Sequence, residues 1–192
     1  MATDSRTRMV CSAASLISSR GVSATSFSDV LTDSGAPRGS IYHHFPDGKK
    51  QLAEDAIRWT SERVLARQRA CPAATAAGVL DWFTDMWRQV VLSSGGSAGC
   101  VVAGVAIDTV AGQAGLLDVV RATFRSWAAL LAEQLEAAGV PAQRAGPISL
   151  AALAGMEGAL ILCRAEGDAA PLEAVAEELL RLLPPETPGA GG

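Results

Sequence analysis

The sequence has few of the groups from which catalytic and metal sites are usually built. It contains two histidines and one tyrosine, and aromatic residues make up 5% of the chain. No C-x-x-C pair, zinc-ligand spacing, nucleophile elbow or phosphate-binding loop occurs. We therefore expect no enzyme, no cofactor and no bound metal. The cysteines are interpreted as buried or partly buried free thiols, with a redox sensor as the less favoured alternative; they are Cys11, Cys71, Cys100 and Cys163.

Long hydrophobic runs are missing as well. The N-terminus is polar as far as Arg8 and leads into no signal-peptide stretch. The longest apolar run, residues 150–163, is interrupted by Glu157. It is shorter than the roughly 20 residues that span a bilayer. With 49% hydrophobic residues in a chain of 192, there is ample material for a core. A soluble cytoplasmic protein without a membrane partner is expected.

Charge is distributed unevenly. Residues 1–50 carry six basic and four acidic side chains, a charge of +2, and the whole chain carries −4, so the remainder carries −6. A basic end on an acidic body suits a protein that meets a polyanion through one patch.

Apolar residues recur at helical spacing throughout, and no strand-like alternation appears. The pattern predicts an all-α fold of about nine helices. The first begins after Thr3 or Asp4 and ends at Gly21, and the second follows Ser26. The others are expected at about 37–44, 48–69, 74–92, 100–109, 116–138, 147–165 and 172–183. Residues 93–98 are expected to form a loop, and 186–192 a disordered tail.

Two of these helices are short and adjacent. Ser26 and Asp29 form a variant capping box, Gly35 ends the first helix, and Pro37 suits the first turn of the second. Two short helices joined at a glycine turn predict a helix-turn-helix.

In this motif the second helix enters the major groove of DNA. Arg38 can bind guanine or hold a phosphate, and Gly39 lets the backbone approach the duplex. Helix N-termini and exposed donors bind phosphates. The candidate DNA-binding residues are Thr25, Ser26, Pro37, Arg38, Gly39, Ser40, Tyr42, His43 and Lys49.

Two alternatives concern the same segment. His43 and His44 could bind a metal, but neighbouring helical side chains point about 100° apart, so a phosphate contact for His43 and a packing role for His44 are favoured. Tyr42 could be purely structural.

The stretch "GVSATSFSDVLTDSGAPRGSIYHHFPDGKKQLAEDAI" closely resembles the N-terminal domain of the tetracycline-repressor (TetR) family, over about residues 6–58. Pro37 departs from the Ser or Thr common there. Within this stretch "GAPRGSIYHHFPDGKKQLA", together with the later "AGCVVAGVAID", is similar to the LmrA-like branch. The resemblance implies a homodimer with a DNA-binding domain (1–48) and a ligand-binding and dimerisation domain (49–192). It further implies a sequence-specific repressor, released from a palindromic operator by a small molecule.

The C-terminal part offers candidates for that ligand and for the dimer. Aromatic residues among many small ones favour a cavity and a mostly apolar ligand, although an ordinary core is the alternative for each residue. The chosen contacts are Trp82, Met86, Phe124 and Trp127, and the possible polar groups are Gln89, Asp108, Thr123 and Glu157. The run "LAALAGMEGALILC" predicts a dimer interface or a monomer core. The rival function is a helical adaptor without ligand-controlled DNA binding.

Overall fold

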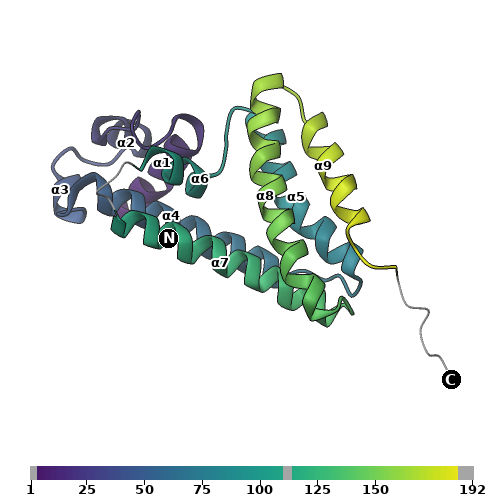
Figure 1. Cartoon of the computed structure of the whole chain (residues 1–192). Coiled ribbons are helices and arrows are strands. Elements are labelled where there is room, and N and C mark those ends of the chain that lie inside the picture. Colours follow the sequence, from purple (N-terminus) through teal and green to yellow (C-terminus); the bar gives the residue numbers. More distant parts are fainter. Residues whose placement is uncertain (1–3, 110–113, 186–192) are drawn as a thin grey trace.

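The computed structural model describes residues 4–109 and 114–185, and over these ranges the chain is all-α, as predicted (Figure 1). The expected tail, 186–192, lies outside the described residues. The nine helices in this part of the chain are α1 (Ser5–Arg20), α2 (Phe27–Ser34), α3 (Ser40–His44), α4 (Gly48–Arg69), α5 (Ala76–Ser94), α6 (Val101–Asp108), α7 (Ala114–Ala137), α8 (Ala142–Glu166) and α9 (Ala170–Arg181).

The helix boundaries follow local capping chemistry. Ser26 caps α2, because its side chain accepts from the Asp29 amide while the Asp29 carboxylate accepts from the Ser26 amide. Thr75 caps α5 in the simpler way, by accepting from the Gly78 amide at 3.2 Å. Gly35 ends α2 in the left-handed conformation that glycine adopts without strain.

Two expected helix starts are wrong. Helix α3 begins at Ser40 and not at Pro37, because the backbone amide and hydroxyl of Ser40 both donate to the Pro37 carbonyl and close a separate turn. Helix α8 begins at Ala142 and not at Pro147. The Pro141 carbonyl accepts the first amides of α8, and the helix tolerates Pro147 at the loss of one hydrogen bond.

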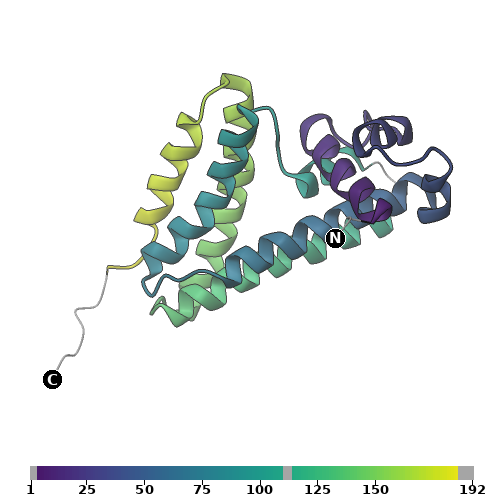
Figure 2. The ribbon, with the colours of Figure 1, turned by 180° about the vertical axis from the view of Figure 1, so that it is seen from behind.

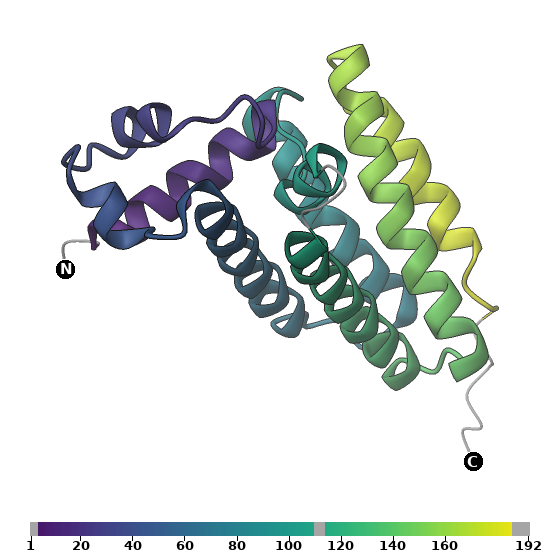
Figure 3. The same ribbon diagram turned by 60° about the vertical axis from the view of Figure 1, so that its left-hand side comes forward.

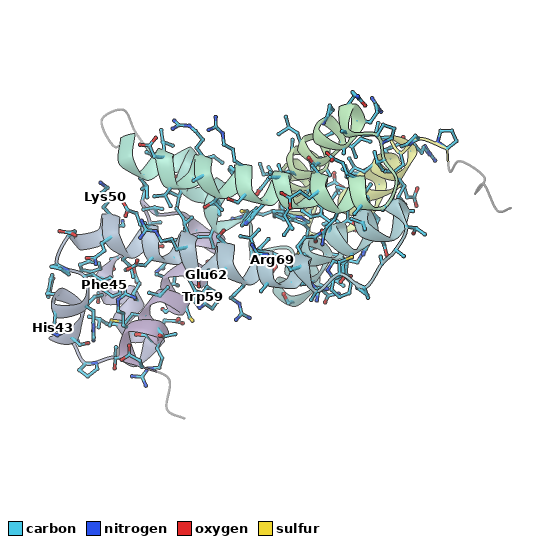
Figure 4. The ribbon with its side chains drawn as sticks, turned by 90° about the horizontal axis from the view of Figure 1, so that it is seen from below. His43, Phe45, Lys50, Trp59, Glu62 and Arg69 are labelled. Carbon is cyan, nitrogen blue, oxygen red and sulfur yellow. The ribbon has the colours of Figure 1, made fainter. Side chains whose placement is uncertain are left out.

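The helices form two groups joined by a long pair. Helices α1–α3, called the head below, lie at one end of the molecule (Figure 1). Helices α5, α8 and α9 stand together at the other end (Figure 2). Helix α4 runs from the head alongside α7 (Figures 3 and 4). The short helix α6 packs on α1 and α7. We call α5–α9 the body.

One hydrophobic core runs through head and body. In the head it buries Met9, Ile41 and Phe45 completely. In the body its largest almost fully buried members are Phe83 and Trp127, at 1% and 2% exposure. Each such side chain contributes on the order of 1.5–3 kcal/mol by burial. Since α4 supplies core residues along its length, head and body pack on a shared helix.

Helix α8 is long and apolar enough to cross a bilayer by length and composition alone. One face of it, including Ala152, Met156 and Cys163, is buried within the protein. The helix packs on α7 and α9. It therefore serves here as a core helix, and its other face carries the exposed apolar residues Leu150 and Ile161.

Candidate DNA-binding surface and ligand cavity

The start of α2 is held by side chains that were predicted to contact DNA. The Ser26 hydroxyl donates to the Asp29 carboxylate at 2.6 Å, and Arg20 forms an ion pair with the same carboxylate at 3.0 Å. The hydrogen bonds from Ser26 hold the pKa of Asp29 below its usual value. Thr25 is buried, and its hydroxyl donates to the Gly21 carbonyl at 2.8 Å. The side chains of Thr25 and Ser26 therefore hold the backbone at the start of α2 in place.

The exposed polar groups lie on α3 and the turns beside it. Arg38, His43 and Lys49 are exposed, and Tyr42 is 70% exposed. Arg38 and Tyr42 line a shallow groove between α2 and α3, with Ser28 and Thr32 among its other residues. Figure 4 shows His43 at the outer end of the head.

Several of these groups are also tied to the fold. The Tyr42 ring packs edge-on against Phe27, with ring centroids 5.7 Å apart. The Lys49 ammonium donates to the Ser23 carbonyl at 3.2 Å. His44 is half-buried, with its ring 6.4 Å from that of Phe45.

Gly39 stands just before α3 without a structural need for glycine. Its φ of −74° is open to any residue, and a Cβ added there would meet nothing within 4 Å. Neither the backbone conformation nor the packing requires glycine here. What glycine does is keep the outer surface of the turn between α2 and α3 free of a side chain.

Two adjoining cavities occupy the region between head and body. The smaller has a volume of about 280 Å³ and is lined mainly by α1, α4 and α5, with Trp59, Met86, Trp87 and Trp127 among its residues. The larger, of about 450 Å³, lies between α1, α6, α7 and α8. The two share four lining residues, which are Ser18, Gly99, Cys100 and Leu160.

The four predicted ligand contacts fall into three groups. Met86 and Trp127 line the smaller cavity, and Phe124 lines the larger. The rings of Phe124 and Trp127 pack edge-on at 5.8 Å. Trp82 lines neither cavity. Its indole N–H donates to the Arg67 carbonyl at 3.0 Å, and the Arg67 guanidinium lies over its ring.

Some lining residues were not chosen from the sequence. Trp59 and Trp87 were among the aromatic residues considered for a cavity, but nothing in the sequence ranked them above ordinary core aromatics; both line the smaller cavity. The α1 residues Cys11, Ser15 and Ser18 also line the cavities. No sequence signal marked them, because α1 was assigned to DNA binding alone.

Family models match most of the chain. The model "Bacterial regulatory proteins, tetR family" covers residues 11–56, and "Transcriptional regulator LmrA/YxaF-like, C-terminal domain" covers residues 76–178. An uncharacterised HTH-type transcriptional regulator of Mycobacterium tuberculosis is 40% identical over 188 residues, covering 95% of this chain and 96% of that protein. The chain belongs to the TetR family of transcriptional regulators.

Within the TetR family the chain falls in the LmrA-like branch. The HTH-type transcriptional regulator LmrA of Bacillus subtilis is 28% identical over 172 residues, which cover 88% of this chain and 91% of LmrA. As a TetR-type regulator, the chain carries its DNA-binding helix-turn-helix in the head. Members of such a family are regulators and not enzymes.

Solved TetR structures share the fold. A TetR regulator from Legionella pneumophila has a TM-score of 0.86 at 22% identity, and covers 95% of this chain and 98% of its own. A cysteine mutant of CifR, solved with 26-bp double-strand operator DNA, has a TM-score of 0.76 at 18% identity, with 96% and 98% covered.

Among the four polar groups suggested for the cavities of this TetR-family chain, Asp108 and Glu157 line the larger one. Burial raises the pKa of Glu157 to about 7. Burial and the nearby Glu157 carboxylate raise the pKa of the Cys100 thiol, which is therefore a protonated, weakly reactive group. Gln89 is exposed and lines neither cavity, and Thr123 is buried.

Proposed function

We propose that this TetR-family regulator is a cytoplasmic homodimeric repressor, released from a palindromic operator by a small, mostly apolar ligand. The observation that carries the proposal is the position of the larger cavity. It is lined by Ile17, Ser18 and Gly21 at the end of α1, and also by α6, α7 and α8 of the body. A ligand bound there would contact the head and the body together.

In this proposal residues 1–48 form the DNA-binding domain. Arg38 reads base edges, Gly39 admits the backbone to the groove, and Pro37 and Ser40 shape the turn that presents Arg38. Tyr42, His43 and Lys49 donate to phosphates. Thr25 and Ser26 contribute through the position of the α2 N-terminus, since their hydroxyls are engaged within the protein.

Residues 49–192 form the ligand-binding and dimerisation domain. The outer surface of α8 and the end of α9 expose apolar side chains in water, which favours burial against a second copy. These side chains are Leu150, Ile161, Leu162, Leu180 and Leu182. A palindromic operator demands a two-fold protein, which such an isologous contact supplies.

The switch follows from this geometry. Two recognition helices must lie about 34 Å apart, one turn of DNA, to bind both half-sites. A ligand can release the operator only if it prefers an arrangement of α1 and α6 that changes this spacing. Met86, Phe124 and Trp127 are the proposed contacts to its apolar part. Trp82 would not contact the ligand; its ring would hold the Arg67 guanidinium in place at the edge of the body.

The proposal is tested by linkage. Genomic fragments that bind in gel shift at low and moderate salt would first define the operator. A ligand from an aromatic panel is then titrated with and without saturating operator, following tryptophan fluorescence. Operator should weaken ligand binding by the same factor as ligand weakens operator binding. Equal ligand affinities in the two titrations would rule out that compound as inducer. Failure to bind any fragment would favour a helical adaptor.

A further inference from the structure

Glu157 on α8 is a carboxyl group that forms no ion pair with any of the described residues. It lines the larger cavity, where most of the other residues are apolar, among them Ala103, Phe124 and Ile161. Its Oε1 atom is buried and has no hydrogen-bond partner among the described residues. A buried carboxylate in this state is costly, and proteins usually avoid it unless a ligand or a proton compensates.

Among the described residues, the elements around Glu157 bring no cation close enough to compensate its charge. From α1 the cavity receives Ser18, from α7 Phe124, and from α6 Asp108, with Cys100 just before that helix. Asp108 carries the same charge as Glu157, and Cys100 is a protonated thiol. On α8 itself Arg164 also lines the cavity, but its side chain is exposed to solvent.

The pKa of Glu157 agrees with this description. Burial raises the pKa to about 7, and the only opposing influence is the hydrogen bond with the Cys100 thiol. A nearby cation would have lowered it. The site is therefore suited to a positive partner that the described part of the chain does not supply.

We propose that Glu157 is the anchoring residue for a cationic inducer, a protonated amine carried on an apolar ring body. This inference rests on the proposed ligand-controlled function and specifies its ligand. An ammonium group supplies both the charge and the hydrogen-bond donors that the carboxylate lacks. A neutral hydroxyl supplies one donor without charge, and a carboxylic acid would be repelled. The apolar body fits the walls formed by Phe124 and Leu160.

Binding of such a ligand is coupled to a proton. Below about pH 7 the carboxyl of the free protein is largely protonated, and it must ionise to pair with an ammonium. The amine itself stays protonated because its pKa is near 10. Amine affinity should therefore fall by about tenfold per pH unit below the pKa of Glu157, with one proton released on binding.

The test uses three probes with one ring system, namely naphthylmethylamine, naphthylmethanol and naphthoic acid of the same ring isomer. Each is titrated by calorimetry at pH 6 and pH 8 into the full-length protein, into Glu157→Gln, and into the control Glu166→Gln. Glu166 lies on the same helix, and its side chain is exposed. At pH 8 the wild type should prefer amine over alcohol by about tenfold or more. Glu157→Gln should lose this preference and keep its alcohol affinity.

The outcomes separate the two proposals. If the alcohol or the acid binds the wild type as tightly as the amine, or if Glu157→Gln keeps the preference for the amine, Glu157 is not the anchor, while ligand control survives. If a protein preparation that binds its operator in gel shift shows no saturable binding heat with any of the probes, both the proposed cationic ligand and the proposed role of the cavity in ring binding are wrong. If Glu166→Gln loses the preference for amine over alcohol to the same extent, Glu157 is also rejected as the anchor, because the preference would then depend on the overall charge of the protein.

Discussion

The carboxylate of Asp108, at the end of α6, accepts a hydrogen bond from the backbone amide of Ser23 in the head at 3.0 Å. A Cβ at Gly21 would lie 2.5 Å from the same carboxylate oxygen, so glycine is required for this approach. Just before α6 begins, the Gly99 amide donates to the Ser18 carbonyl at 2.7 Å. Both ends of α6 are thus attached to the end of α1, and α6 also forms a wall of the larger cavity.

Asp108→Ala tests this attachment. The variant loses an acceptor for the Ser23 amide, and should be destabilised by about 1.5–3 kcal/mol, as expected for a hydrogen bond to a charged group. Hydrogen exchange at Ser23 should accelerate, and any ligand that weakens operator binding should do so by a smaller factor. Asp118→Ala is the control, because Asp118 pairs locally with Arg121 on the exposed face of α7. Unchanged exchange at Ser23 would show that the contact is not maintained in solution.

Arg38 and Lys49 should contribute to operator binding in different ways. Arg38→Ala is expected to weaken specific binding by roughly 1–3 kcal/mol and to relax base preference, because Arg38 is the residue proposed to read base edges. Lys49→Ala should weaken all sequences alike and lower the salt slope by about one, as for a phosphate contact. Binding to operator and to scrambled duplexes across salt concentrations measures both. An Arg38→Ala protein with wild-type operator affinity would remove Arg38 from recognition.

Gly39→Ala separates DNA binding from folding. A Cβ at this position meets no atom within 4 Å and φ is −74°, so the fold should accept it with a stability change below about 1 kcal/mol. Operator binding should weaken, since in the proposed complex the methyl group would project toward the duplex. Thermal unfolding and operator titration of the same sample provide the two readouts. Retained operator affinity would place the turn away from the DNA.

Gly158→Arg probes the proposed dimer. No atom lies within 4 Å of a Cβ at Gly158, so the monomer should tolerate the new side chain, whereas a close contact between two α8 helices should not. Sedimentation should show that the variant is a monomer, and an operator titration should show that it no longer binds the operator. The matched control is Ala122→Arg on the exposed surface of α7. A dimer that survives Gly158→Arg but not Ala122→Arg would move the interface to α7.

Local chemistry made much of the fold predictable. Ser26, Asp29 and Gly35 act within a few residues, and their capping roles appear in the structure as expected. The start of α3 was wrong because Pro37 fits a helix and a turn equally well, and the hydrogen bonds of Ser40 decide between them. The start of α8 was wrong because the helix was expected to begin only at Pro147, whereas it begins directly after Pro141 and includes Pro147.

The site was less predictable, because it depends on contacts between distant elements. Exposed DNA-binding candidates such as Arg38 follow from the motif alone. The cavity does not, since α1 contributes Ser15 and Ser18 to its walls only through packing on α4 and α6. Trp82 and Trp87 look alike in sequence, yet the first lies against Arg67 and the second lines the cavity. Glu157 was among several polar candidates, and only the structure places it in the cavity wall with a buried oxygen that lacks a hydrogen-bond partner among the described residues.

The raised pKa of Glu157 makes a prediction for stability that needs no ligand. Its ordinary value is 4.5 and its value in the folded protein is about 7, so between these pH values the folded state holds a proton that the unfolded state has released. Stability should therefore fall as pH rises through this window, by up to about 3 kcal/mol.

Glu157→Gln removes this titration, and its free energy of unfolding should change much less between pH 5 and pH 8. Asp29 and Glu173 have lowered pKa values, and their contributions are lost only in acid, outside this window. Urea unfolding at both pH values gives the comparison, with Glu166→Gln as the control that should follow the wild type. If wild type and Glu157→Gln change equally between the two pH values, the Glu157 carboxyl is already compensated, and the case for a cationic partner is lost.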